Sequence, residues 1–128
     1  MPMDRATLQD LEARASRANA ERSITGYLTY RNERFTQYLE GSAEDLSETM
    51  SRIRTDARHG ISVEIELGTN RRRFPGWSMR LLDPLWHPSG SVIDAIEELI
   101  GHGPMSRADQ DLVRPELVRL VGEVAGNT

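Results

Sequence analysis

The fold is decided by the stretch Ile24-Thr-Gly-Tyr-Leu-Thr-Tyr-Arg-Asn-Glu-Arg-Phe-Thr-Gln-Tyr-Leu-Glu-Gly41. On either side of a polar centre at residues 31–34 the side chains alternate with a period of two, which predicts an antiparallel β-hairpin. In the second strand this alternation places Gln37 on a face that is otherwise half apolar. The stretch therefore predicts one amide side chain on a largely apolar surface of a sheet.

Two helices are predicted around this hairpin. Before it, a capping-box pattern at Thr7 to Asp10 and apolar residues at helical spacing predict a helix over residues 5–22. After it, a second capping pattern begins at Ser42, and the apolar spacing predicts a helix that runs to Arg58. The hairpin is therefore expected between two amphipathic helices.

Two further strands complete the predicted sheet. Residues 61–67 alternate strictly between apolar and polar side chains, as a half-buried antiparallel strand does. A loop then leads to Trp77-Ser-Met-Arg-Leu-Leu82, the last predicted strand. This order resembles an α+β ferredoxin-like sheet with two helices on one face and its first strand missing. That strand lies in the middle of such a sheet, so its neighbours need another segment to pair with.

The chain divides into two predicted parts. Residues 1–83 form the sheet domain, and residues 84–128 form a C-terminal helical extension. The extension contains two helical segments, at 91–100 and 106–125, separated by a glycine- and proline-rich break. Pro115 is expected to kink or restart the second segment. We expect this extension to pack on the sheet or on a partner.

Composition limits the classes of function. The chain has 128 residues, 38% hydrophobic and 28% charged, which suits one compact domain. Its formal charge is −4 and all 16 basic residues are arginines without a continuous basic face, so we expect no nucleic-acid partner. No apolar run reaches the roughly 18 residues of a membrane span. With no signal-peptide core either, we expect no membrane partner and a cytoplasmic location.

Metal and thiol chemistry are not indicated by the sequence. There is no cysteine, so a disulfide framework, a thiol nucleophile and a cysteine-built metal site are all excluded. His59, His87 and His102 are widely spaced and stand outside any metal-ligand motif. We expect no metal site and no catalytic residue.

Five short motifs follow one another in an order typical of one family. They are Ala15-Ser-Arg-Ala-Asn19, Ile24-Thr-Gly26, Arg34-Phe-Thr-Gln-Tyr-Leu-Glu-Gly41, Asp56-Ala-Arg-His59 and Arg72-Arg-Phe-Pro-Gly-Trp-Ser-Met79. Through them the first 83 residues resemble a BLUF domain, a flavoprotein that senses blue light with FAD. The resemblance implies that FAD lies between the two helices. It also implies that a glutamine on the third strand bridges the flavin and a tyrosine on the first strand.

The resemblance implies roles for particular residues. The cofactor-binding positions are Asn19, Gln37, Arg52, Asp56 and Met79, and the signal-relay positions are Gln37, Trp77 and Met79. In the family, blue light moves an electron and a proton between tyrosine and flavin, and the hydrogen bonds of the glutamine rearrange. A glutamine suits such a switch because its side chain offers two donors and one acceptor, which rotation or tautomerisation inverts.

Most of these residues also have an ordinary structural interpretation. An asparagine late in a helix, such as Asn19, commonly lies near a C-terminal cap. Arg52 and Asp56 stand four residues apart and could form a surface ion pair that contributes about 0.2 to 0.5 kcal/mol. Trp77 and Met79 could be core residues. The sequence leaves these alternatives open.

The tyrosines depart from the family pattern. With the family spacing, the photoactive tyrosine would fall before Met1, in the missing first strand. Alternation places Tyr27 and Tyr38 on the face opposite Gln37, and Tyr30 ends its strand. We therefore expect an N-terminally truncated or degenerate BLUF-like module in which one wall of the FAD pocket is missing.

Two functions follow from this resemblance. The first is a regulatory module whose blue-light sensing is impaired or lost and which acts through protein contacts, as a homodimer or with a protein partner. The alternative is a functional FAD-binding blue-light photoreceptor. An enzyme such as an acyl-phosphate hydrolase is not expected, because the sequence has no glycine-rich loop after a first strand to hold phosphate.

Overall fold

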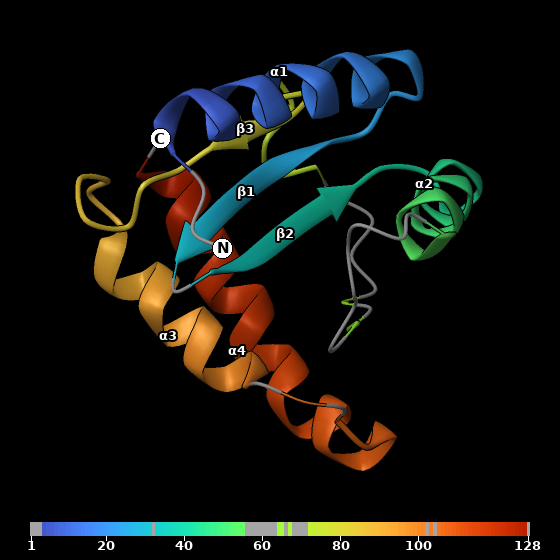
Figure 1. Ribbon diagram of the computed structural model, residues 1–128. Coiled ribbons are helices and arrows are strands. Elements are labelled where there is room, and N and C mark those ends of the chain that lie inside the picture. The colour runs from blue at the N-terminus through green and yellow to red at the C-terminus, as the bar shows by residue number, and fades with distance from the viewer. Residues whose placement is uncertain are drawn as a thin grey trace.

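The computed structural model describes residues 4–31, 33–55, 64, 65, 67, 72–101, 103 and 105–127. Its helices and strands are those of an α+β protein (Figure 1). In chain order they are α1 (Arg5–Glu21), β1 (Thr25–Arg31), β2 (Arg34–Glu40), α2 (Ala43–Thr55), β3 (Arg80–Leu81), α3 (Gly90–Ile100) and α4 (Arg107–Gly126).

The described strands form one sheet with the order β2-β1-β3. β1 and β2 are antiparallel, and their register pairs Tyr27 with Tyr38 and Leu28 with Gln37. β3 runs parallel to β1. The backbone amide of Leu82 also donates to the carbonyl oxygen of Leu28 at 2.8 Å, so the pairing continues beyond β3. The predicted hairpin is confirmed, whereas the last strand is shorter than the predicted Trp77–Leu82.

The predicted strand over residues 61–67 lies mostly outside the described residues. The three that are described, Glu64, Ile65 and Leu67, do not belong to a strand. At these positions the prediction is wrong, because alternation supplies a suitable face but a strand also needs a neighbour to pair with. Instead, Glu64 forms an ion pair with Arg54 of α2.

The helix starts depend on short polar caps. α1 begins at Arg5, as predicted, but its capping residue is Asp4 and not Thr7: the Asp4 carboxylate accepts a hydrogen bond from the Thr7 amide at 2.7 Å. At the start of α2, Ser42 Oγ accepts from the Asp45 amide at 3.1 Å, as the sequence predicted. α2 is described to Thr55, and the rest of its predicted extent lies outside the described residues.

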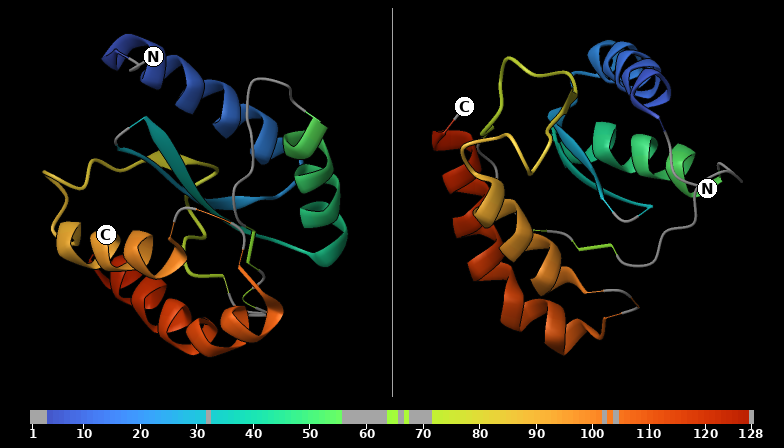
Figure 2. Two further views of the ribbon diagram at one scale, coloured as in Figure 1. Left: turned by 60° about the horizontal axis from the view of Figure 1, so that its bottom comes forward. Right: turned by 60° about the vertical axis from the view of Figure 1, so that its left-hand side comes forward.

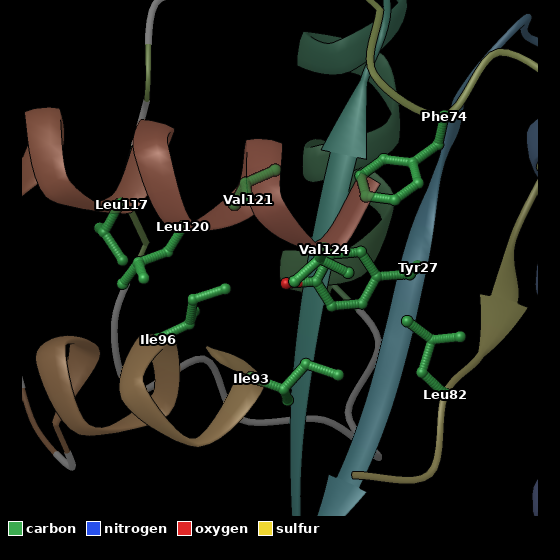
Figure 3. Packing of buried hydrophobic residues seen from close by; sticks show 9 residues of the cluster. All are labelled: Tyr27, Phe74, Leu82, Ile93, Ile96, Leu117, Leu120, Val121 and Val124. Carbon is green, nitrogen blue, oxygen red and sulfur yellow. The ribbon is translucent and has the colours of Figure 1, made fainter. Parts of the chain in front are cut away.

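Helices cover the two faces of the sheet differently (Figures 1 and 2). α1 lies on one side, and α3 and α4 together lie on the other. The second side holds the main buried apolar cluster, formed by Tyr27, Phe74, Leu82, Ile93, Ile96, Leu117, Leu120, Val121 and Val124 (Figure 3). Helices α3 and α4 therefore contribute to one core with residues of this side of the sheet. Three other buried apolar residues, Ile24, Leu28 and Met79, lie outside this cluster.

The last helix is continuous through its proline. α4 contains Pro115 within its 20 residues, and its start is capped by Ser106, whose Oγ accepts from the Asp109 amide at 3.1 Å. The predicted restart at Pro115 is therefore wrong, because the helix continues through this residue. Leu117, Leu120, Val121 and Val124 follow it at helical spacing and are buried, so packing offsets the one backbone hydrogen bond that a proline removes.

A glycine is required where β1 meets β2, and this gives a test of the fold. Gly26 has φ +153°, and a Cβ added there would lie 1.9 Å from the carbonyl oxygen of Tyr38. We predict that Gly26→Ala lowers the free energy of unfolding by more than about 3 kcal/mol in urea titrations. The control is Gly76→Ala, because a Cβ at Gly76 meets nothing within 4 Å. Equal stabilities of the two variants would contradict the hairpin register.

Candidate functional site

The candidate site lies on the α1 side of the sheet, where Gln37 and Met79 meet. Gln37 of β2 is exposed, and its Nε2 lies 3.9 Å from the Sδ of Met79, within the range of an N–H···S hydrogen bond. Met79 itself is 5% exposed. Leu28 is the cross-strand partner of Gln37, so its side chain lies on the same face of the sheet. There Leu28 is buried. The structure thus brings together two residues that the sequence predicted to act together.

Asn19 anchors the end of α1 to the segment that carries Met79. It is 6% exposed, and its Nδ2 donates to the backbone oxygen of Ser78 at 2.9 Å. Its own backbone oxygen accepts from the amides of Arg22 and Ile24. The side chain therefore has a structural task, and its Oδ1 and the second N–H of Nδ2 are left to take part in the predicted contact with a cofactor.

The predicted pair on α2 is described only in part. Arg52 is exposed, whereas Asp56 lies outside the described residues, so the proposed ion pair between them is not tested. Within the described chain no carboxylate lies within ion-pair distance of Arg52, while Arg54 pairs with Glu64. Arg22 Nε lies 3.7 Å from the carboxylate of Glu48, which joins the end of α1 to α2. A guanidinium such as that of Arg52 carries a planar fork of donors that suits carboxylates and phosphates.

Trp77 lies on the other side of the sheet from Met79. Its ring stacks on Phe74 with centroids 5.4 Å apart, and the guanidinium of Arg80 lies 4.8 Å from the Trp77 centroid. Trp77 packs against the cluster under α3 and α4, whereas Met79 contacts Gln37. The sequence predicted both for one relay, but residues 77–79 are not a regular strand, so period-two alternation does not apply there.

The tyrosines are divided between the two faces. Tyr27 and Tyr38 are cross-strand partners whose rings stack 5.8 Å apart against Phe74, on the face opposite Gln37, as predicted. Tyr30 is paired with Phe35 across the hairpin, and their rings are 4.7 Å apart. Because Tyr30 lies two residues beyond Leu28 on the same strand, it shares the face of Gln37 as a diagonal neighbour.

The importance of Tyr30 was missed in the sequence reasoning, although the signal was present. The alternation that set Tyr27 apart from Gln37 also places Tyr30 on the face of Leu28. The sequence places Tyr30 at the end of the predicted strand, which argues against it as a replacement for the photoactive tyrosine. β1 continues to Arg31, so the position is held in regular pairing.

Several polar and apolar groups of the described chain fit a flavin. Gln37 presents an exposed amide beside the buried thioether of Met79, and Arg52 offers a cation without a described ion-pair partner. On α2 the buried hydroxyl oxygen of Thr49 has no hydrogen-bond partner among the described residues, which is a group that a ligand could satisfy. A bound flavin would supply blue-light absorption and accept an electron. No cluster of three metal-ligating side chains is found in the described part of the chain.

The fold is that of an α+β domain with an exposed amide beside a buried thioether. A family model for BLUF, described as sensors of blue-light using FAD, matches residues 1–80. The chain belongs to the BLUF family of blue-light sensors. BLUF domains are sensory modules that use FAD.

Relatives and solved structures agree with this assignment. The photoactivated adenylate cyclase subunit beta of Euglena longa is 36% identical over 80 residues, which is 61% of this chain and 9% of that subunit. The blue light- and temperature-regulated antirepressor BluF of Escherichia coli (strain K12) is 30% identical over 90 residues, 70% of this chain and 22% of that protein. This chain therefore spans only a small part of these relatives.

Among solved structures, the dark state of BlrB, a BLUF protein, superposes with a TM-score of 0.63 at 26% identity. That match covers 99% of this chain and 89% of BlrB. Klebsiella pneumoniae BlrP1 with FMN and cyclic diGMP has a TM-score of 0.58 at 33% identity over 74% of this chain and 25% of that chain. The described part of this chain contains no helix that is both long enough and apolar enough to cross a membrane.

The burial of Tyr27 predicts a loss of stability in alkali. Burial, helped by the nearby Tyr38 and Glu97, raises the pKa of Tyr27 above its ordinary value of about 10. Above that pH the unfolded chain loses a proton that the folded chain keeps, so the free energy of unfolding falls by about 1.4 kcal/mol per pH unit. Below it, this contribution is fully present.

The measurement is urea unfolding at pH values on both sides of 10 for the wild type and Tyr27→Phe. The variant should lack this part of the alkaline slope, because phenylalanine does not ionise. An identical slope in both proteins would show that Tyr27 is not buried as described.

Proposed function

We propose that this chain is a BLUF-type regulatory module that acts through protein contacts and whose photocycle is impaired or lost. The proposal rests on the positions of Gln37 and of two tyrosines. The amide of Gln37 keeps its contact with Met79, whereas Tyr27 and Tyr38 lie on the opposite face of the sheet. On that opposite face, neither of these two rings lies beside a flavin held at the Gln37 amide.

Exposed apolar side chains at the helical layer support the part of the proposal that concerns protein contacts. Leu85 is 80% exposed and Trp86 is 84% exposed, next to each other in the turn before α3. The turn is held by Asp83, whose backbone oxygen accepts from the amides of Trp86 and His87. A large aromatic side chain presented on a fixed backbone is typical of an interface anchor. A second copy of the chain or an effector protein would bind there.

The residues of the site would act on a bound flavin in distinct ways. Gln37 would orient its amide toward the ring and Met79 would supply an apolar wall beside it, because the two side chains already touch. Arg52 would hold the phosphates of the dinucleotide by its planar fork of donors. Asp56 and the Oδ1 of Asn19 would complete the polar contacts.

A working photoreceptor is the second candidate function, and Tyr30 favours it. Tyr30 is the one tyrosine of the three that shares the face of Gln37, where diagonal neighbours lie within reach of aromatic and long side chains. Electron transfer to a flavin does not need direct hydrogen bonding between donor and acceptor. Tyr30 would then replace the tyrosine of the first strand.

The visible spectrum of the protein purified with FAD distinguishes these functions. We expect flavin to bind and blue light to leave its absorption maximum unshifted, because Tyr27 and Tyr38 lie on the face opposite Gln37. A shift that is abolished by Tyr30→Phe and by Gln37→Leu would establish the photoreceptor instead. The matched control is Gln9→Leu on the exposed side of α1. A protein that stays colourless in excess FAD would exclude both flavin-based functions.

The exposed pair Leu85 and Trp86 can be tested separately as a protein contact. We predict that Trp86→Ala leaves the unfolding midpoint nearly unchanged, since its side chain is 84% exposed, and abolishes self-association or binding of the partner. Size-exclusion chromatography with light scattering measures the first readout. Glu98→Ala, an exposed change on α3, is the control. A wild-type protein that is monomeric at all concentrations would leave only a different protein as the partner.

A further inference from the structure

A buried carboxylate at the end of β2 binds the backbone of the segment that leads to Met79. Glu40 is 6% exposed, and it stands three residues from Gln37, so it points to the other face of the sheet. Its Oε1 accepts from Thr25 Oγ1 and from the Phe74 amide, both at 2.7 Å. Its Oε2 accepts from the Arg73 amide at 2.7 Å and from the Tyr38 hydroxyl at 3.3 Å.

These four donors make the carboxylate a fixed point. A buried carboxylate must replace its hydration shell with hydrogen bonds, and bonds to an ionised acceptor are stronger than bonds to a neutral one. No described arginine or histidine forms an ion pair with Glu40, so the donors are all neutral groups with defined directions. Two of them are consecutive backbone amides, which fixes the path of residues 73 and 74 relative to β2.

The fixed segment continues to the candidate site. Phe74 follows with 3% exposure, between Tyr27 and Trp77 at centroid distances of 5.4 Å each. Next, the backbone oxygen of Trp77 accepts from the Gly26 amide at 2.9 Å. Met79 then crosses to the α1 side and meets Gln37. One end of this short segment is held by Glu40, and the other end touches the switch amide.

The same segment also contacts α4. Phe74 and Tyr27 pack in one cluster with Val121 and Val124 (Figure 3). A Cβ added at Gly122 would lie 2.8 Å from Nη1 of Arg73, so the guanidinium crosses α4 at this glycine. The two residues whose amides Glu40 holds are therefore also the two that contact the last helix.

We propose that Glu40 is a positioning residue that couples the Gln37–Met79 contact on one face of the sheet to helix α4 on the other. With residues 73 and 74 fixed, a displacement of Met79 is passed along a tethered segment to α4 instead of being absorbed by a free loop. In the proposed regulatory module, this coupling connects the Gln37–Met79 contact with the helical layer of α3 and α4. It rests on that function for its signal, but the coupling itself exists in the protein without flavin.

The test is a double-mutant comparison by two-dimensional NMR of the flavin-free full chain. Gln37→Leu removes the contact with Met79, and Glu40→Gln keeps the shape of the side chain while replacing one acceptor oxygen with a donor that opposes a backbone amide. In the wild-type background, Gln37→Leu should shift the amide signals of Gly122 and Val124. In the Glu40→Gln background these shifts should fall by at least about half, since the two substitutions then share one network.

Controls make the outcome decisive. Glu44→Gln, an exposed change in the first turn of α2, should leave the α4 shifts as large as in the wild type. If Glu40→Gln does not fold, Thr25→Val removes one donor while the charge stays, and the same criterion applies. Equal shifts in the two backgrounds, or none at α4 in the wild-type background, would overturn the proposal. Because neither light nor flavin is used, failure of the photoreceptor test and failure of this one are distinguishable.

Discussion

The structure depends on the pairing of β1 at both of its edges. β1 is antiparallel to β2 on one side and parallel to β3 on the other, and its first five residues are buried. A strand in this position must satisfy its backbone within the sheet and present side chains to both helical layers. Gly26 lets β2 approach closely, and alternation along β1 sends Tyr27 to α3 and α4 and Leu28 toward the side of α1. Every later assignment of a residue to a face follows from this strand.

The two faces are chemically different. The α1 side exposes the Gln37 amide beside Met79 and fits a ligand, whereas the α4 side is an aromatic and aliphatic core closed by the C-terminal helices. Few segments of the described chain contribute residues to both faces of the sheet. Residues 73 to 79 are the main exception, because they start at the Glu40 carboxylate, fill the core with Phe74 and end at Met79. These residues therefore connect the side of Gln37 and Met79 with the core under α3 and α4.

Local patterns were sufficient for much of the fold and part of the site. Period-two alternation predicted the hairpin and separated Tyr27 and Tyr38 from Gln37, and helical spacing predicted α1, α2, α3 and α4. The same rules failed where the outcome depended on partners. The alternating residues 61–67 have no strand at their described positions, α4 is continuous through Pro115, and Trp77 and Met79 lie on opposite faces. The predicted capping box at Thr7 was wrong, because the Thr7 amide donates to the carboxylate of Asp4, which caps the helix three residues earlier.

The sequence by itself determined the family and the hairpin and predicted Gln37 as the switch amide, because short motifs and local periodicity carry that information. Only the tertiary structure decided which groups meet. The contact of Gln37 with Met79 spans 42 residues and the hydrogen bond of Asn19 to Ser78 spans 59. The use of Glu40 as a buried acceptor for residues 73 and 74 was equally invisible, since a carboxylate at a strand end is usually solvated. Long-range contacts of this kind follow from how the layers pack, which no local pattern encodes.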